Sequence, residues 1–158
     1  MSEITIYTDG AASGNPGPGG YGIVLKSGSH YKEISQGYRL TTNNRMELLA
    51  VIVALEAIRI KKSKVTIYTD SRYVCDAVEK GWLKEWNKSR FKKKKNVDLW
   101  QRFLMVSPTH SIEFCWIKGH SDIPENERCD LLAVQASQQK NLLVDEGYEN
   151  ENEQEAIW

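Results

Sequence analysis

The sequence has few cysteines, no long hydrophobic run and no net charge. Its three cysteines form no Cys-x-x-Cys pair, and because an odd number cannot all be bridged within one chain, we expect free, largely buried thiols. The longest strongly apolar run, residues 48–55, is far too short to span a bilayer. The first residues show neither the basic start nor the apolar core of a signal peptide. These absences argue against a membrane protein, and we expect a cytoplasmic protein that is a monomer.

Charge is distributed unevenly along the 158 residues. Residues 145–158 hold six acidic side chains and no lysine or arginine, which leaves residues 1–144 with 21 basic and 15 acidic side chains. The last residues are polar and without hydrophobic periodicity, a composition typical of disorder. We therefore expect one folded domain over residues 1–144 and an acidic, disordered tail over residues 145–158.

The four residues Ile-Tyr-Thr-Asp occur twice, at residues 6–9 and 67–70. Both copies follow β-branched residues and predict short buried strands that end on a carboxylate, Asp9 or Asp70. Two such strands lying parallel would bring both aspartates to one edge of the sheet, where open α/β sheets place their chemistry. The alternative is that Asp9 begins an Asp-Gly turn and that Asp70 caps the helix beginning at Ser71.

The stretch from residue 10 to residue 20 contains five glycines and two prolines. This composition predicts a substrate-facing loop that is neither helix nor inner strand. A hairpin is predicted next, followed by a helix over residues 46–58 that is apolar almost all round and hence buried between layers. Glu47 lies in its first turn. Its spacing from Asn44 fits a capping box, and the alternative is a carboxylate held at the edge of the sheet near the two aspartates.

Four carboxylates could meet at one site if a mixed sheet flanked by helices brings these element ends together. So much negative charge is costly unless a hard divalent cation compensates it. Carboxylates without a cysteine or histidine cluster favour magnesium or manganese over zinc. Two such ions about 4 Å apart are a known device for phosphodiester hydrolysis. The four residues are Asp9, Glu47, Asp70 and Asp130.

Basic and aromatic side chains are interleaved between residues 80 and 95. This stretch contains eight lysines and arginines and one acid, Glu85. Aromatic rings among cations suit the sugar-phosphate backbone of a nucleic acid. The alternative is a solvated lysine loop with tryptophans that belong to the core. An acid cluster beside such a segment favours a polynucleotide as substrate.

Six motifs together resemble bacterial-type ribonuclease HI, in order and spacing, over about residues 3–148. They are Thr-Asp-Gly with Gly-Asn-Pro-Gly (residues 8–17), Thr-Thr-Asn-Asn-Arg-Met-Glu (41–47), Thr-Asp-Ser (69–71), Asn-Val-Asp-Leu-Trp (96–100), Lys-Gly-His (118–120) and Pro-Glu-Asn-Glu-Arg-Cys-Asp (124–130).

The resemblance implies an α/β protein with the ribonuclease H-like fold. This fold has a five-stranded mixed sheet flanked by helices, with the first three strands antiparallel and the last two parallel to the first. The implied activity of the domain is sequence-independent, endonucleolytic hydrolysis of the RNA strand of an RNA–DNA hybrid by a two-metal-ion mechanism, which leaves 3′-hydroxyl and 5′-phosphate ends. Two Mg²⁺ ions are implied, with Mn²⁺ as a substitute. Rival hypotheses are a non-catalytic hybrid-binding module on the same fold and another metal-dependent nuclease of the superfamily.

The resemblance also assigns roles to residues. The four carboxylates match catalytic metal ligands, and His120 matches a mobile loop histidine linked to proton transfer or product release. Arg72 stands where relatives often carry glutamine, and Leu40 where they often carry an arginine of the phosphate pocket. Expected substrate contacts are Asn15, Asn43 and Asn44 near the minor groove, Thr42 and Asn96 at a DNA-strand phosphate, Arg72, and Trp82, Trp86, Lys88, Lys92, Lys93, Lys94 and Lys95 in the basic protrusion.

Overall fold

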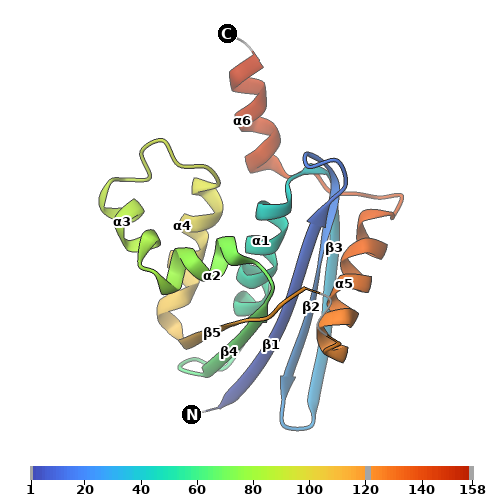
Figure 1. The fold of residues 1–158 in the computed structure, drawn as a ribbon, viewed down its shortest axis with the longest axis vertical. Coiled ribbons are helices and arrows are strands. Elements are labelled where there is room, and N and C mark those ends of the chain that lie inside the picture. Colours follow the sequence, from blue (N-terminus) through green and yellow to red (C-terminus); the bar gives the residue numbers. More distant parts are fainter. Residues whose placement is uncertain (1, 120–121, 157–158) are drawn as a thin grey trace.

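The computed structural model describes residues 2–119 and 122–156. A five-stranded sheet runs through the molecule in the order β3-β2-β1-β4-β5 (Figure 1). Strands β1, β2 and β3 are antiparallel neighbours, β4 pairs parallel to β1, and β5 pairs parallel to β4. The expected fold is therefore confirmed. The strands span Glu3–Ala12 (β1), Gly17–Ser27 (β2), His30–Thr41 (β3), Lys64–Thr69 (β4) and Ser111–Trp116 (β5).

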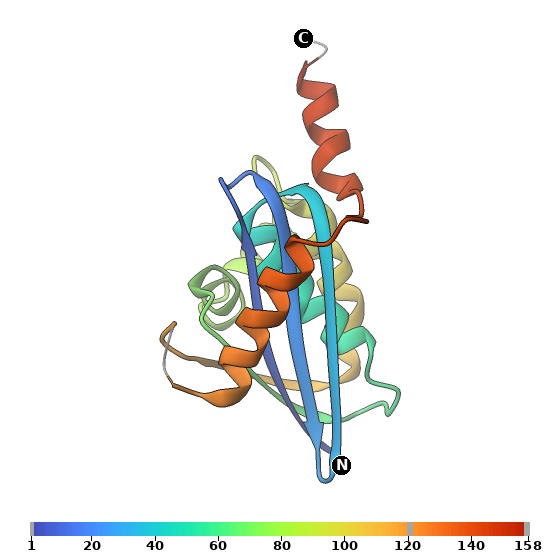
Figure 2. The same cartoon turned by 90° about the vertical axis from the view of Figure 1, so that its right-hand side faces the viewer.

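Helices cover both faces of this sheet (Figures 1 and 2). Helix α5 packs on β2 and β1 from one side, while α1 packs on β1 from the other side and is backed by α4. In the described part of the chain, no helix is long and apolar enough to cross a membrane. The helices are α1 (Asn43–Glu56), α2 (Arg72–Glu79), α3 (Trp82–Lys88), α4 (Val97–Val106), the short 3₁₀ helix η1 (Ser107–Thr109), α5 (Pro124–Ser137) and α6 (Glu146–Ala156).

Helix α1 forms the centre of the core, as its apolar sequence predicts. Apolar side chains on all its sides are buried, among them Met46, Leu48 and Ile52, because the sheet lies on one side and α4 on the other. On α4, Trp100 is fully buried, and its indole N–H donates to the hydroxyl of Tyr73 on α2 at 2.8 Å. The packing of α1 thereby fixes the N-terminal end of the helix at the edge of the sheet.

The glycine-rich stretch is not one loop, contrary to the prediction. Strand β1 continues to Ala12 and β2 begins at Gly17, and both are inner strands of the sheet. The glycines serve close packing of helix on sheet. A Cβ atom on Gly20 would lie 2.7 Å from the carbonyl oxygen of Ala133 on α5. The connecting turn is therefore short, and it extends past the sheet beside the N-terminus of α1.

The structure also differs from the expected disorder after residue 144, since it describes helix α6 there. The segment before it runs beside β3, where the amide of Arg39 donates to the carbonyl of Leu143 at 2.9 Å. Asp145 is buried, and its carboxylate accepts from Arg45 at 2.7 Å. These partners lie about a hundred residues away in the sequence, so local composition does not reveal them.

Candidate active site

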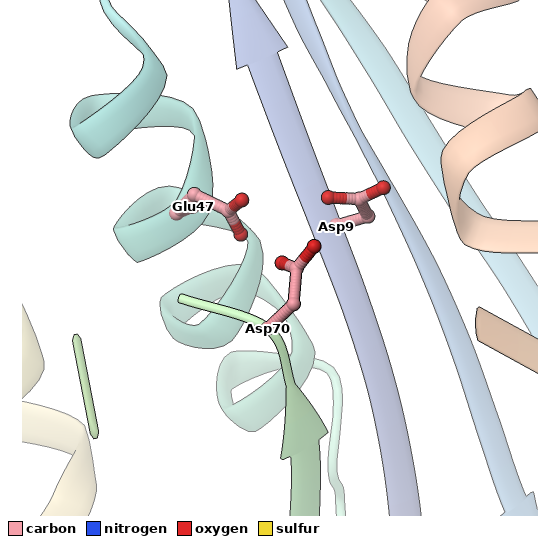
Figure 3. A group of neighbouring side chains, drawn as sticks. All are labelled: Asp9, Glu47 and Asp70. Carbon is pink, nitrogen blue, oxygen red and sulfur yellow. The ribbon is translucent and has the colours of Figure 1, made fainter. Parts of the chain in front are cut away.

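Three carboxylates from three different elements meet at one edge of the sheet (Figure 3). Asp9 lies on β1, Glu47 on the second turn of α1, and Asp70 directly after β4. Each offers an oxygen within 4.8 Å of the others. The register of β1 and β4 pairs Ile6 with Ile67, so that the two copies of the repeated tetrapeptide lie side by side. The predicted proximity of Asp9 and Asp70 is thus observed.

The turn and cap alternatives for the two aspartates do not hold. The carboxylate of Asp9 accepts from the amide of Gly10 at 2.9 Å, yet both residues belong to β1 and pair with β2, so no turn begins there. Helix α2 is capped by Ser71, whose hydroxyl accepts from the amide of Val74 at 3.2 Å. Asp70 is therefore left to face the other acids.

Glu47 is not part of a capping box either. The N-cap of α1 is Thr42, whose hydroxyl accepts from the amide of Arg45 at 3.2 Å, and Asn44 lies inside the helix. Gly10 lets α1 approach β1 closely, since a Cβ there would lie 2.6 Å from the amide nitrogen of Glu47. This close approach brings the Glu47 side chain next to Asp9.

Burial and mutual repulsion perturb the acids in a consistent direction. Burial, followed by the charges of Asp70 and Asp130, raises the pKa of Asp9 to about 7. Burial, followed by the charges of Asp9 and Asp70, raises the pKa of Glu47 well above its usual range. Each group thus holds a proton more tightly than a solvated carboxylate does.

Two of the acid oxygens are buried without a hydrogen-bond partner among the described residues, Oε2 of Glu47 and Oδ1 of Asp70. Buried polar atoms are normally satisfied, so such orphaned acceptors point to a missing positive partner. Oxygen donors that carry negative charge are the ligands that hard divalent cations prefer. The site therefore fits a cation such as Mg²⁺ or Mn²⁺.

Asp130 stands at the side of this site. It is exposed on α5 and lines the same cavity of about 550 Å³ as the three clustered acids, together with Asn43, Asn44 and Arg72. It is not among the three acids whose oxygens lie within 4.8 Å of one another. Its charge nevertheless contributes to the raised pKa of Asp9. His120 lies outside the described residues, although Gly119 before it approaches Asp70.

A second cavity, of about 380 Å³, adjoins the first, with Asn44 lining both. Asn15 accepts from the amide of Asn43 at 3.0 Å, so the turn after β1 is held against the start of α1. The structure thus brings the predicted asparagines and phosphate-pocket residues together. This cavity is lined by Asn15, Pro16, Thr42, Asn44, Lys95, Asn96, Tyr148 and Glu151.

Comparison with known proteins identifies the family. Residues 1–138 match the RNase H family model. The chain belongs to the ribonuclease H family. It is 56% identical over 153 residues to ribonuclease H of Rippkaea orientalis, covering 94% of this chain and 93% of the relative. It is 48% identical over 153 residues to ribonuclease HI of a Synechocystis species, covering 93% of this chain and 95% of the relative.

Solved ribonuclease H structures share the fold. LC9-RNase H1, described as a type 1 RNase H with the type 2 active-site motif, superposes with a TM-score of 0.79 at 31% identity, covering 95% of this chain and 80% of that one. LC11-RNase H1, solved in complex with an RNA/DNA hybrid, superposes with a TM-score of 0.60 at 27% identity, covering 84% of this chain and 95% of that one.

The basic segment over residues 80–95 fits both interpretations of its sequence, each in a different part. Trp86 is half-buried and packs edge-on against Trp100 with ring centroids 5.8 Å apart, as a core residue does. Trp82 is 43% exposed, with the ammonium of Lys80 5.3 Å from its ring centroid. Lys88 and the four lysines at residues 92–95 are exposed. The segment is therefore attached to the core through its aromatic side and presents its charges outward.

Sequence reasoning missed Trp116, which lies beside the acid cluster. Its indole N–H donates to the carbonyl of Asp70 at 3.0 Å. The guanidinium of Arg72 stacks on its ring, 3.8 Å from the centroid. Trp116 holds Arg72 over the edge of the acid cavity. The signal that could have found it is its position at the C-terminal end of β5, because open α/β sheets place their chemistry at that end of parallel strands.

Proposed function

We propose that this protein is an endonuclease that hydrolyses the RNA strand of RNA–DNA hybrids without sequence preference. The observation that carries the proposal is the cluster of Asp9, Glu47 and Asp70, with its orphaned buried oxygens, in a chain of the ribonuclease H family. The adjoining polar cavity and basic segment supply a surface for a nucleic acid. The expected products carry 3′-hydroxyl and 5′-phosphate ends.

Asp9, Glu47, Asp70 and Asp130 would hold the divalent cations of the reaction. Bound Mg²⁺, for which we propose two ions, lowers the pKa of a coordinated water and neutralises charge that develops on the phosphate. The carboxylates would bind these cations by concentrating negative charge at one position. Because they come from four separate elements, the fold fixes their spacing before substrate binds.

Short polar side chains on the first cavity suit recognition of a hybrid. The RNA strand displays its 2′-hydroxyls in a wide, shallow minor groove, where they can be contacted without reading bases. Asn43 and Asn44 line the first cavity, and Asn15 and Asn44 line the second. We assign these three side chains to the minor groove. We assign Thr42 and Asn96 in the second cavity to a DNA-strand phosphate.

The remaining assignments concern the basic segment, Arg72 and His120. Exposed lysines bind phosphates through charge and counterion release, which carries no sequence preference. We assign Arg72, which stacks on Trp116, to the nucleic-acid backbone next to the scissile phosphate. We assign proton transfer or product release to His120. One chain contains both cavities, so we expect a monomer to be active.

The proposal is tested with one labelled RNA sequence presented single-stranded, as duplex RNA and as an RNA–DNA hybrid, with and without Mg²⁺ or Mn²⁺. We expect metal-dependent cleavage of the hybrid alone. A circular substrate with an internal RNA segment distinguishes an endonuclease from an exonuclease, which needs an end. Binding of the hybrid without cleavage in either metal would identify a non-catalytic binding module instead.

A further inference from the structure

The acidic helix α6 contributes to the cavity that we assign to the DNA-strand phosphate. Tyr148 and Glu151 line this cavity beside Thr42 and Asn96. Among its lining residues one is a cation, Lys95, and one is an acid, Glu151. A phosphate that enters therefore meets one charge of each sign. The inference rests on the proposed function, because it concerns the same substrate.

Helix α6 is held in this place by a buried ionic network. The carboxylate of Asp145 accepts from the hydroxyl of Thr41 at 2.7 Å and from Nη2 of Arg45 at 2.8 Å. Arg45 also donates to Asp98 at 2.7 Å. The charge of Arg45 is thus neutralised by two carboxylates. Arg45 therefore supplies no free positive charge that could attract a phosphate to the cavity. Asp145, directly before α6, is thus fixed by partners on β3 and α1.

A second arginine is also engaged by α6. Arg39 donates from Nε and Nη2 to the carboxylate of Glu149, each at 2.9 Å. Arg39 is the neighbour of Leu40, which stands where an arginine of the phosphate pocket is often found in the family. The acidic helix therefore pairs with the cation that is next to Leu40 in the sequence.

We propose that Glu151 weakens binding of the DNA-strand phosphate. Its carboxylate and the phosphate would share a cavity of about 380 Å³, so their repulsion opposes the attraction of Lys95. Solvent screens the repulsion between the Glu151 carboxylate and a phosphate, but within one cavity the repulsion energy remains appreciable. Helix α6 thereby raises the KM for the hybrid and shortens the lifetime of the complex, while the chemistry at the acid cluster is unaffected.

The test is Glu151→Gln in the full chain, assayed by steady-state cleavage of the hybrid in Mg²⁺. We expect KM to fall roughly three- to tenfold at low salt, as loss of one screened like-charge contact allows, with kcat changed less than about twofold because catalysis needs interactions made only in the transition state. The gain should diminish as salt is added. Glu149→Gln, which frees Arg39, should lower KM by a smaller factor.

The matched control is Glu146→Gln, which removes the same charge from an exposed position on the same helix, outside the lining of the cavity. A KM for Glu151→Gln equal to that of the wild type or of Glu146→Gln would overturn the proposal. Fluorescence anisotropy with a labelled hybrid measures binding without cleavage. If the wild type binds hybrid but cuts nothing, the proposed function fails while the comparison of binding still decides the role of Glu151.

Discussion

The acid cluster and the basic segment are built in opposite ways. Asp9, Glu47 and Asp70 come from three elements far apart in the sequence and are largely buried, each placed by strand register or helix packing. Residues 80–95 are consecutive, mostly exposed, and attached to the core through Trp86 and Phe91. The difference implies that activity depends on each of the three carboxylates, whereas substrate binding by the basic segment depends on its total charge. Single substitutions should therefore be severe in one and mild in the other.

The largest effect is expected from Asp70→Asn. This change removes a charge at nearly constant volume, so cleavage should fall by at least about a thousandfold while the fold remains. The free energy of unfolding should rise by about 1 kcal/mol without metal above about pH 7, where Asp9 is ionised, because a like-charge contact with Asp9 is relieved. Initial rates and urea denaturation measure the two effects.

A matched control for this prediction is Asp76→Asn on α2, where the carboxylate pairs with Lys80 at the surface. Its activity should stay within about twofold of the wild type, as is usual for a surface ion pair. If Asp70→Asn kept more than about a tenth of the wild-type rate, the expectation for an essential electrostatic group would not be met. Asp70 would then be removed from the proposed metal ligands.

The next effect is that of replacing all four lysines at residues 92–95 by alanine. We expect KM to rise at least about tenfold at low salt and the salt dependence of hybrid binding to flatten, since fewer counterions are released. Lys92→Ala alone should raise KM only about twofold. The control replaces four exposed lysines elsewhere, Lys32, Lys61, Lys64 and Lys140. An unchanged salt slope in the first variant would remove residues 92–95 from the substrate surface.

The pH dependence of stability tests the burial of the acids. Because the pKa of Asp9 is raised to about 7, the native metal-free protein binds a proton that the unfolded chain has already released at intermediate pH. The stabilisation from this protonation is complete below about pH 4 and is lost as the pH rises through about 7. Relative to Asp9→Asn, the wild type should therefore lose more than about 1 kcal/mol of unfolding free energy across this range.

Chemical denaturation in the presence of a chelator, at several pH values between 4 and 8, provides this measurement. Added Mg²⁺ should restore stability at the alkaline end, because a cation that binds the native acids favours the folded state. A constant difference between the two proteins at all pH values would mean that the Asp9 carboxyl is as solvated as in an unfolded chain.

The repeated tetrapeptide made one part of the site predictable. Two strands of equal sequence and phase, paired in parallel, bring Asp9 and Asp70 to the same edge, and the observed register does so. Glu47 could not be decided from sequence, because its role depends on how closely α1 approaches Gly10. Spacing alone fitted a cap, and the structure shows that Thr42 is the capping residue.

The errors share a cause, since each concerns a contact between distant segments. The sequence predicts a loop at Gly20, because the packing of this residue against Ala133 on α5 is invisible in local composition. The sequence predicts disorder for the acidic tail, because the contacts that hold it involve Arg45 and Arg39, which lie 100 and 110 positions from their partners Asp145 and Glu149. Local rules describe strands and turns well, but they do not describe what a turn or a tail packs against.

The smallest effect is expected from Arg72→Gln, because Arg72 lines the acid cavity but carries a positive charge like those of the basic segment. Arg72 carries a charge like those of the basic segment, but it is positioned by a neighbour, its guanidinium stacked 3.8 Å from the Trp116 ring centroid. We expect KM to rise about two- to fivefold and the salt slope to fall by about one phosphate contact. Arg59→Gln, at an exposed position remote from the acids, is the control. If Trp116→Leu raises KM as much as Arg72→Gln does, although Arg72 is still present, stacking on Trp116 positions the Arg72 charge for the substrate. If Trp116→Leu leaves KM unchanged, Arg72 contributes only its charge, as the lysines of the basic segment do.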